Sequence, residues 1–355
     1  LIIEIIKFQS LNNIFQAKDS IIFYFRFGVI SSLLNLIMNY FFNRNIKNKK
    51  WFILGENNLL NCLKKDNIEN PQFLIKKFNI ISNIDQVNLE EIKKVAGIIL
   101  QKNKKLRYEE EHFILAMKRL DIPVLSNLEW CEKYLQRIPP KIIEEELQRG
   151  KFLYPKFNIF EYRIKKIFEF CISLILIFIG LPIIILAAIF IYFEDKGAIF
   201  YSQIRSGLYG KKIKIYKLRT MRTNAEEDGI QWSHNDDKRI TKTGNFLRKT
   251  RIDEIPQLIS VLNGDMSLIG PRPERPEIEK ELLKDIPYYD YRNVIKPGLS
   301  GWAQVNYPYG ASVFDSSKKL SYDIYYITNF SFFLDLLILF QTIKIIFNLK
   351  GYKPD

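Results

Sequence analysis

Two adjacent carboxylates, Asp253 and Glu254, are the residues of this chain that could do chemistry most directly. Three cations come just before them, at Arg248, Lys249 and Arg251. Asp253 is a good N-cap residue, and the apolar stretch after it predicts a helix that begins at the pair. Two roles then stay open: the pair caps a helix and complements its dipole, or it is a reactive centre. Since neighbouring helical residues point about 100° apart, one carboxylate can be a nucleophile while the other binds a metal.

Two further groups of cations flank this pair in the sequence. In residues 213–221 apolar and cationic residues alternate, so a strand would place Lys217 and Arg219 side by side on one face. A solvated strand face explains this group without any function. Gly270-Pro271-Arg272-Pro273 would hold the backbone of its arginine rigidly, because the flanking prolines restrict it. Taken with the carboxylates, the cations favour a site for a polyphosphate. The predicted phosphate-binding residues are Lys217, Arg219, Arg248, Arg251 and Arg272.

A second glycine-punctuated loop, residues 296–305, carries an aromatic ring and an amide. Trp302 could stack on a nucleobase, and Gln304 could hydrogen-bond to it. We therefore predict these two as nucleotide-binding residues.

The composition narrows the classes of partner. The net charge of +14 suits nucleic acid, an anionic lipid surface or a phosphorylated substrate, and the long apolar runs favour lipid. Three cysteines without paired spacing and two distant histidines, His112 and His234, imply neither a disulfide framework nor a metal site built on those residues. Because the chain begins at Leu1 rather than Met, we expect a piece of a longer protein.

Three apolar stretches indicate contact with a membrane. Residues 21–42 precede a basic cluster and predict a transmembrane helix, the alternative being a buried helix of a soluble domain. Residues 167–193 carry one charge, Glu169, and have Pro182 at their middle. Because both ends of this stretch are basic, we predict a re-entrant helix over about 164–193, broken at the proline, with a kinked span as the alternative. Residues 331–350 fit an interfacial helix or a soluble core helix.

The remaining elements predict an α/β protein. Residues 51–139 alternate short apolar strands with helical stretches, which is typical of βαβ units and of a Rossmann-like domain. Its loop at 55–58 stands where a phosphate-binding loop would be. It carries one glycine, whereas a dinucleotide fingerprint needs three, so we expect a degenerate, structural or regulatory domain. Residues 1–50 would be a membrane segment and linker, residues 140–160 a linker, and residues 161–355 a membrane-embedded α+β catalytic domain.

From about Tyr162 to Leu349 the motifs and their order resemble those of the bacterial sugar transferase family. Its members are monotopic polyprenyl-phosphate sugar-1-phosphate transferases. The matching stretches are the proline-broken helix around Pro182, residues 216–221, residues 247–258, residues 264–267, residues 270–273 and residues 296–305. Residues 51–139 are similar to the CoA-binding-like domain of larger members. In those members residues 21–42 would be the last of several transmembrane helices.

The resemblance implies a reaction in two steps and a residue for each task. Asp253 would attack the β-phosphate of a UDP-sugar, UMP would leave, and the phosphosugar would pass to undecaprenyl phosphate. Glu254 would hold Mg²⁺, while Lys217, Arg219 and Arg272 would offset charge in the transition state. The implied setting is the cytoplasmic face of a bacterial inner membrane, at the first membrane step of exopolysaccharide, capsule or O-antigen synthesis. Membrane lipid is then a partner and nucleic acid is not, and a homodimer stays open.

Two departures from the family pattern are visible. Many members have Gly-Arg-Asn after Gln304-Val305-Asn306, where this chain continues with Tyr307, so an arginine that contacts phosphate in them has no counterpart at that place. Leu181 stands where a serine commonly precedes the helix-breaking proline. The alternative function is a catalytically inactive, nucleotide-sensing membrane module that regulates polysaccharide synthesis. A nucleotide-sugar dehydratase or dehydrogenase would need an intact dinucleotide loop, which argues against that class.

Overall fold

The computed structural model describes residues 50–54, 61, 78–81, 95–100, 108–150, 155, 158–225, 237–307, 310 and 312–347. The predicted transmembrane helix at 21–42 and the loop at 55–58 lie outside the described residues. The chain divides into two compact units, and the main division falls between Ser126 and Asn127.

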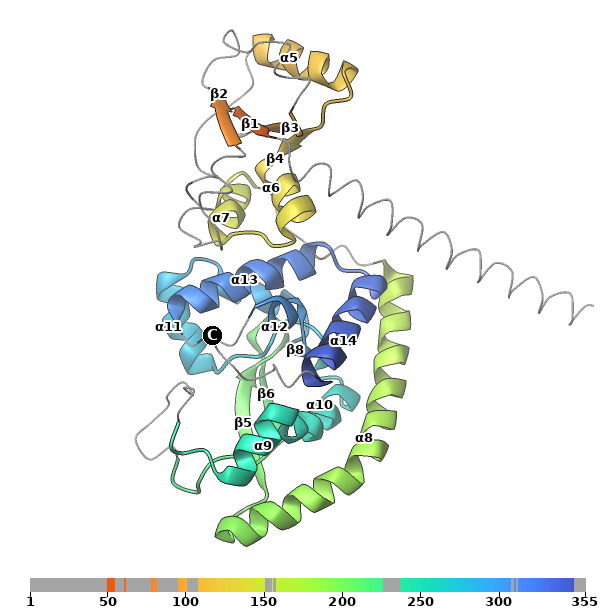
Figure 1. The fold of residues 1–355 in the computed structure, drawn as a ribbon, viewed down its shortest axis with the longest axis vertical. Coiled ribbons are helices and arrows are strands. Elements are labelled where there is room, and N and C mark those ends of the chain that lie inside the picture. The colour runs from red at the N-terminus through yellow and green to blue at the C-terminus, as the bar shows by residue number, and fades with distance from the viewer. Residues whose placement is uncertain are drawn as a thin grey trace, which may run out of the picture. The chain divides into compact units, whose positions relative to one another are not determined.

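The first unit is a parallel sheet with the strand order β2-β1-β3-β4 (Figure 1). Its strands are β1 (Trp51–Leu54), β2 (Phe78–Ile81), β3 (Gly97–Leu100) and β4 (Val124–Ser126), and helix α5 (Tyr108–Arg119) lies between the last two in the chain. Ile53, Ile98 and Ile99 are completely buried. Parallel strands are usually covered on both faces and are therefore built from continuous apolar runs. The parallel order agrees with the α/β pattern that the sequence predicts.

The segment that follows, which the sequence places partly in a linker, folds onto the second unit. It contains α6 (Asn127–Trp130), the π-helical turn η2 (Cys131–Leu135) and α7 (Pro140–Gln148). The amide of Ile138 donates to the carbonyl of Ser321 at 2.9 Å. Ile142 and Ile143 on α7 are only 2% and 1% exposed. Because its apolar side chains are buried, this segment is part of the second unit rather than a separate connection.

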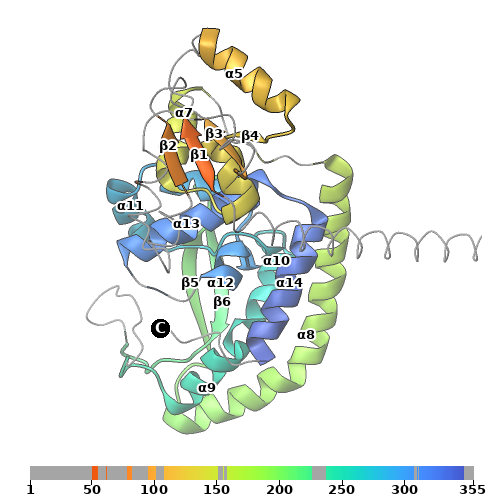
Figure 2. The ribbon, with the colours of Figure 1, turned by 45° about the horizontal axis from the view of Figure 1, so that its top comes forward.

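Helix α8 (Ile159–Asp195) has 37 residues and continues through Pro182. At its start the side chain of Asn158 accepts a hydrogen bond from the amide of Phe160 at 3.0 Å. Figures 1 and 2 show that the axis of α8 changes direction along its length. An interior proline is the ordinary cause of such a bend, because it removes one backbone hydrogen bond and clashes with the preceding turn. Among the described helices, α8 alone is long and apolar enough to cross a membrane.

The rest of the second unit is a mixture of short strands and helices. An antiparallel hairpin of β5 (Phe200–Ser206) and β6 (Lys212–Leu218), joined by η3 (Leu208–Gly210), follows α8. Next come α9 (Lys242–Thr250), η4 (Ile252–Gln257), α10 (Leu258–Leu262) and the parallel pair β7 (Ser267–Ile269) and β8 (Gly298–Ser300), with α11 (Pro276–Asp285) and η5 (Tyr289–Val294) between those two strands. The unit ends with α12 (Trp302–Asn306), α13 (Val313–Thr328) and α14 (Phe332–Phe347).

One apolar core joins these elements. It contains Ile215 of β6, Leu258 of α10, Ile269 of β7, Ile327 of α13 and Ile338 of α14, all nearly or completely buried. Helix α14 runs beside α8 in both views of the ribbon (Figures 1 and 2). The core therefore holds the hairpin, the short parallel pair and the apolar helices in one body.

A buried charged cluster fixes α8 to this body. Lys165 Nζ donates to Asp335 Oδ2 on α14 at 2.7 Å and to the Ile269 carbonyl on β7 at 3.0 Å, and it lies 3.2 Å from Glu169 Oε1. Glu169 also accepts from the amide of Leu268 at 3.0 Å. Removing one partner from such a cluster leaves a buried charge without compensation, which is costly. Since β7 leads directly into the Gly-Pro-Arg-Pro loop, the cluster joins the apolar helix to that loop.

Candidate active site

Asp253 and Glu254 lie in a tight turn rather than at the cap of a helix. Helix α9 ends at Thr250, and Arg251 follows in the left-handed conformation with φ 56°. The 3-10 helix η4 then carries both carboxylates in its first turn, and no side chain caps it. The prediction of Asp253 as an N-cap is therefore wrong, because the chain reverses at Arg251, two residues earlier. Both carboxylates are buried, with 6% and 7% exposure.

Glu254 is held by cations from three parts of the chain. Its Oε1 accepts from Arg272 Nη2 at 2.6 Å and from Lys217 Nζ at 3.2 Å, and its Oε2 lies 3.6 Å from Arg251 Nη1. Burial alone would raise the pKa of Glu254, but the three cations, Arg272 most strongly, outweigh it and hold the pKa well below its usual range. Glu254 is therefore an ionised carboxylate whose orientation is already set.

Asp253 is in a different state from its neighbour. Within the part of the chain that the structure describes, the ion pairs and side-chain hydrogen bonds of the dyad go to Glu254, and none goes to the carboxylate of Asp253. Burial and then the charge of Glu254 raise the pKa of Asp253 to about 6, against the opposing charges of Lys217, Arg248 and Arg272. At neutral pH this carboxylate is mostly ionised, and its oxygens accept from no side chain of the described residues. A carboxylate nucleophile needs this state.

The two cations predicted to share a strand face are separated in the structure. Lys217 lies in strand β6 and contacts Glu254 of the dyad. The strand ends at Leu218, so Arg219 does not continue its alternation of side chains. The guanidinium of Arg219 instead contacts Asp195 at the end of α8. The sequence-based expectation fails here because the strand ends before Arg219.

The other predicted phosphate-binding arginines lie around the dyad. Arg251 and Arg272 contact Glu254 directly. Arg248 donates through Nε to Thr220 Oγ1 at 2.8 Å, and its charge still acts on Asp253.

The loop that carries Arg272 is held from both sides. The backbone carbonyl of Arg272 accepts from Arg292 Nη2 at 2.9 Å. At Gly270, where the loop leaves β7, an added Cβ would lie 2.5 Å from the carbonyl oxygen of Lys296. The backbones approach too closely there for a side chain, so glycine permits the contact that sets the start of the loop.

Trp302 and Gln304 are not brought to the dyad. The Trp302 side chain is 4% exposed, belongs to the apolar core and donates its indole N–H to the carbonyl of Gln136 at 2.8 Å. Gln304 donates through Nε2 to the carbonyl of Leu299 at 3.1 Å. A ring enclosed in this way has no open face for a nucleobase. The structure therefore gives Trp302 a packing role and Gln304 a hydrogen bond to the backbone of its own loop, and their contact with a nucleotide stays a prediction.

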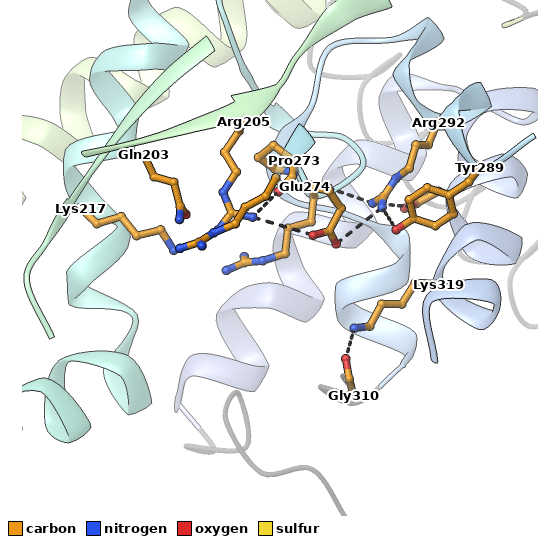
Figure 3. Close-up of polar contacts among 12 residues, drawn as sticks. Gln203, Arg205, Lys217, Pro273, Glu274, Tyr289, Arg292, Gly310 and Lys319 are labelled. Carbon is orange, nitrogen blue, oxygen red and sulfur yellow. Dashed lines mark hydrogen bonds and ion pairs between the residues drawn. The ribbon is translucent and has the colours of Figure 1, made fainter. Parts of the chain in front are cut away.

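A second charged group, absent from the sequence-based predictions, lies around Glu274 (Figure 3). Glu274 lies 3.8 Å from Arg205 Nη1 and 3.7 Å from Arg292 Nη1. The hairpin register pairs Tyr201 with Lys217, so alternate side chains of β5 from Tyr201 to Arg205 share the face of Lys217. The alternation of side chains along β5 is the sequence signal that could have predicted Arg205 on the face of Lys217.

The chain is similar to known proteins, over the second unit above all. The family model described as Bacterial sugar transferase matches residues 160–349. The chain is 36% identical over 263 residues to the UDP-N-acetylgalactosamine-undecaprenyl-phosphate N-acetylgalactosaminephosphotransferase of Aeromonas hydrophila, an alignment that covers 74% of this chain and 61% of that protein. It is 39% and 36% identical to the UDP-glucose:undecaprenyl-phosphate glucose-1-phosphate transferases of Klebsiella pneumoniae and Escherichia coli (strain K12), over 48% of this chain and 37% of each of those proteins. The chain thus spans less than two thirds of the length of these relatives.

Proposed function

Because the chain belongs to the bacterial sugar transferase family, we propose that it transfers a sugar 1-phosphate from a UDP-sugar to undecaprenyl phosphate and releases UMP. The names of the three relatives contain undecaprenyl phosphate together with a UDP-sugar. The observation that carries the proposal is the unequal state of the dyad. Glu254 is occupied by cations, whereas Asp253 is ionisable near pH 6 and has no hydrogen-bonded side-chain partner among the described residues.

In the first step Asp253 acts as the nucleophile. One carboxylate oxygen attacks the phosphorus that bears the sugar, the bond from that phosphorus to the bridging oxygen breaks, and the electron pair leaves with UMP. No base has to activate Asp253, because a carboxylate with a pKa of about 6 is mostly ionised at neutral pH. Lys217 and Arg272, which already lie at the dyad, offset the charge that develops on the phosphoryl oxygens.

In the second step the lipid acceptor regenerates the enzyme. An oxygen of undecaprenyl phosphate attacks the same phosphorus, and the bond from phosphorus to the Asp253 oxygen breaks. The acceptor has to arrive from the membrane, and α8 packs directly on the turn that carries the dyad. At Gly180 an added Cβ would lie 2.9 Å from Ile255 Cγ2. The apolar helix and the nucleophile are therefore close enough for a membrane-bound phosphate to reach the dyad.

The membrane arrangement follows from the same helix. Side chains such as Phe178, Ile185 and Phe190 of α8 are exposed, which is costly in water and favourable in lipid. In the proposal the bend at Pro182 lets α8 enter and leave the bilayer by one face, so that both basic ends stay in the cytoplasm. The protein would then lie on the cytoplasmic side of a bacterial inner membrane.

Mg²⁺ is the proposed cofactor, and the residues present fit it. This ion typically takes one or two carboxylates and completes its shell with water and substrate phosphate oxygens. The described residues contain no group of three or more metal-ligating side chains, so the protein would supply at most the two adjacent carboxylates of Asp253 and Glu254. Glu254 would take the ion by giving up hydrogen bonds from Lys217 and Arg272. Glu254 would hold the ion, which supplies positive charge next to the donor diphosphate.

The test uses the purified full chain with Mg²⁺, undecaprenyl phosphate and a panel that includes UDP-N-acetylgalactosamine and UDP-glucose. Release of UMP from at least one donor is expected, and Asp253→Asn should abolish it. Asp290→Asn is the matched control, because Asp290 is an exposed aspartate of η5. UMP release that persists in Asp253→Asn would refute the assignment of Asp253 as the nucleophile. A wild-type chain that binds nucleotide but releases no UMP from any donor would favour the inactive, nucleotide-sensing alternative.

A further inference from the structure

The charged group around Glu274 has two kinds of member. Arg292 is 3% exposed and is fully engaged, because it lies 2.8 Å from Asp323 Oδ2 and donates to Tyr289 Oη at 2.5 Å. Arg205 and Lys319 are only half-buried. The first of these side chains comes from β5 and the second from α13, so two distant segments converge beside one carboxylate.

The side chains of Arg205 and Lys319 are both anchored, and Arg205 keeps a buried donor to spare. Arg205 donates through Nη1 to the carbonyl of Pro273 at 3.3 Å, and its buried Nε donates to no atom of the residues that the structure describes. Lys319 donates to the carbonyl of Gly310 at 2.6 Å, and its ammonium charge interacts with that of Glu274. Figure 3 shows Arg205 extending down from β5 toward Glu274, and Lys319 below Glu274 with its amine directed to Gly310.

The electrostatics indicate that this place favours an anion. Burial first, and then the charges of Arg272 and Arg275, lower the pKa of Arg205, with Glu274 opposing. Burial first, and then Arg292 and Arg272, lower the pKa of Lys319, while Glu274 and Asp315 oppose it. Cations that repel one another around one shared carboxylate are stabilised when a further anion binds among them.

Arg272 links this place to the dyad. It contacts Glu254 at 2.6 Å, and its charge also acts on both Arg205 and Lys319. The charge of Arg272 therefore acts both on the dyad and on the second group of cations. The two phosphates of a nucleotide-sugar share one bridging oxygen, so when one of them lies at Asp253 the other falls a few ångströms away, within reach of a side chain beyond Arg272.

We propose that Arg205 and Lys319 form a second phosphate subsite, which binds the phosphate of the nucleoside monophosphate that leaves in the first step. The inference rests on the proposed function and deepens it, since it assigns the leaving group to residues that the dyad does not include. Arg205 shares its strand face with Gln203 and Tyr201, and Tyr201 Oη accepts from Arg275 at 3.4 Å and from Gln203 at 3.1 Å. The subsite thus continues into polar side chains rather than into the apolar surface of α8.

The experiment measures equilibrium binding of UMP to the full chain in detergent, without turnover. Lys319→Gln and Arg205→Gln should each weaken binding about tenfold or more, because each removes a charge-assisted hydrogen bond. Lys319→Arg keeps the charge and should stay close to the wild type. Lys214→Gln is the matched control, because Lys214 lies on the exposed face of the same hairpin and should leave UMP affinity unchanged. Uridine, which lacks the phosphate, should bind equally to all variants.

Several results would overturn the subsite. UMP affinity could be unchanged in the double variant Arg205→Gln/Lys319→Gln while its thermal unfolding matches that of the wild type. Uridine binding could weaken as much as UMP binding, which would indicate a distorted pocket. A third result is an effect confined to the KM for undecaprenyl phosphate, which would assign the cations to the lipid phosphate. A wild-type chain that binds UMP through these residues but transfers nothing would contradict the proposed function and leave the subsite standing.

Discussion

The rate of UMP release in the first step should follow the ionisation of Asp253, with a midpoint near pH 6. The carboxylate attacks only when it has lost its proton, and its pKa is raised to about 6 by burial and by the charge of Glu254. The rate should therefore fall as pH falls through the midpoint. At about pH 5, one unit below it, roughly one-tenth of the carboxylate is ionised, so the rate should be about one-tenth of the plateau at about pH 8.

Neighbouring charges should move this midpoint in opposite directions. Glu254→Gln removes a negative charge that raises the pKa of Asp253, so the midpoint should fall. Lys217→Gln removes a positive charge that lowers that pKa, so the midpoint should rise. Both variants also lose rate at the plateau, since both residues lie at the reacting phosphate in the proposal. The quantity to compare is the position of the midpoint.

The assay is single-turnover release of UMP with enzyme in excess over UDP-sugar and without lipid acceptor. Omitting the acceptor matters, because a phosphate monoester has its second pKa at about 6 and would add a titration of its own. Asp290→Asn, on the surface, should keep the wild-type midpoint. A rate that stays flat down to about pH 4.5 would refute the raised pKa of Asp253 in the working enzyme, whereas UMP release by Asp253→Asn would refute the nucleophile assignment. Shifts of the same sign in the two charge variants would refute the electrostatic account.

Three further predictions concern the elements that position the dyad. Lys165→Met should lower the free energy of unfolding by roughly 3–5 kcal/mol, because Glu169 and Asp335 then stay buried without a cation and keep only hydrogen bonds from neutral donors. Lys166→Met, on the exposed side of α8, should change thermal unfolding little. Gly180→Leu should slow transfer, because the new side chain would displace Ile255. The double variant Gly180→Leu/Ile255→Ala should recover part of the rate. A double variant as slow as the single one would argue against this contact. Trp302→Phe should lower the free energy of unfolding by about 1 kcal/mol, because one hydrogen bond is lost, and should leave the KM for UDP-sugar unchanged. A raised KM at unchanged stability would instead favour a nucleobase contact.

Local sequence patterns were sufficient for several features. The parallel strands of the first unit and the long apolar helix with its interior proline are visible in runs of neighbouring residues, because hydrophobic periodicity and length are properties of a short segment. The same holds for the adjacent pair Asp253-Glu254 and the proline-flanked Arg272, whose residue types alone indicate phosphate chemistry. The order of these motifs along the chain was sufficient to recognise the family, which the comparisons confirm.

Tertiary structure decided how the work of the site is divided. Asp253 and Glu254 are neighbours of nearly equal chemistry, and they differ because Lys217 and Arg272, 37 and 18 residues away in the chain, contact only one of them. Trp302 lies in the core rather than at a nucleotide, and the cations of the second subsite come from β5 and α13. The strength of a charge interaction and the burial of a side chain depend on distances in space between segments that are far apart in the chain. The sequence could therefore indicate phosphate chemistry at this pair and, through the family resemblance, an expected role for each carboxylate, while only the fold shows that Glu254 is held by cations and that Asp253 is not.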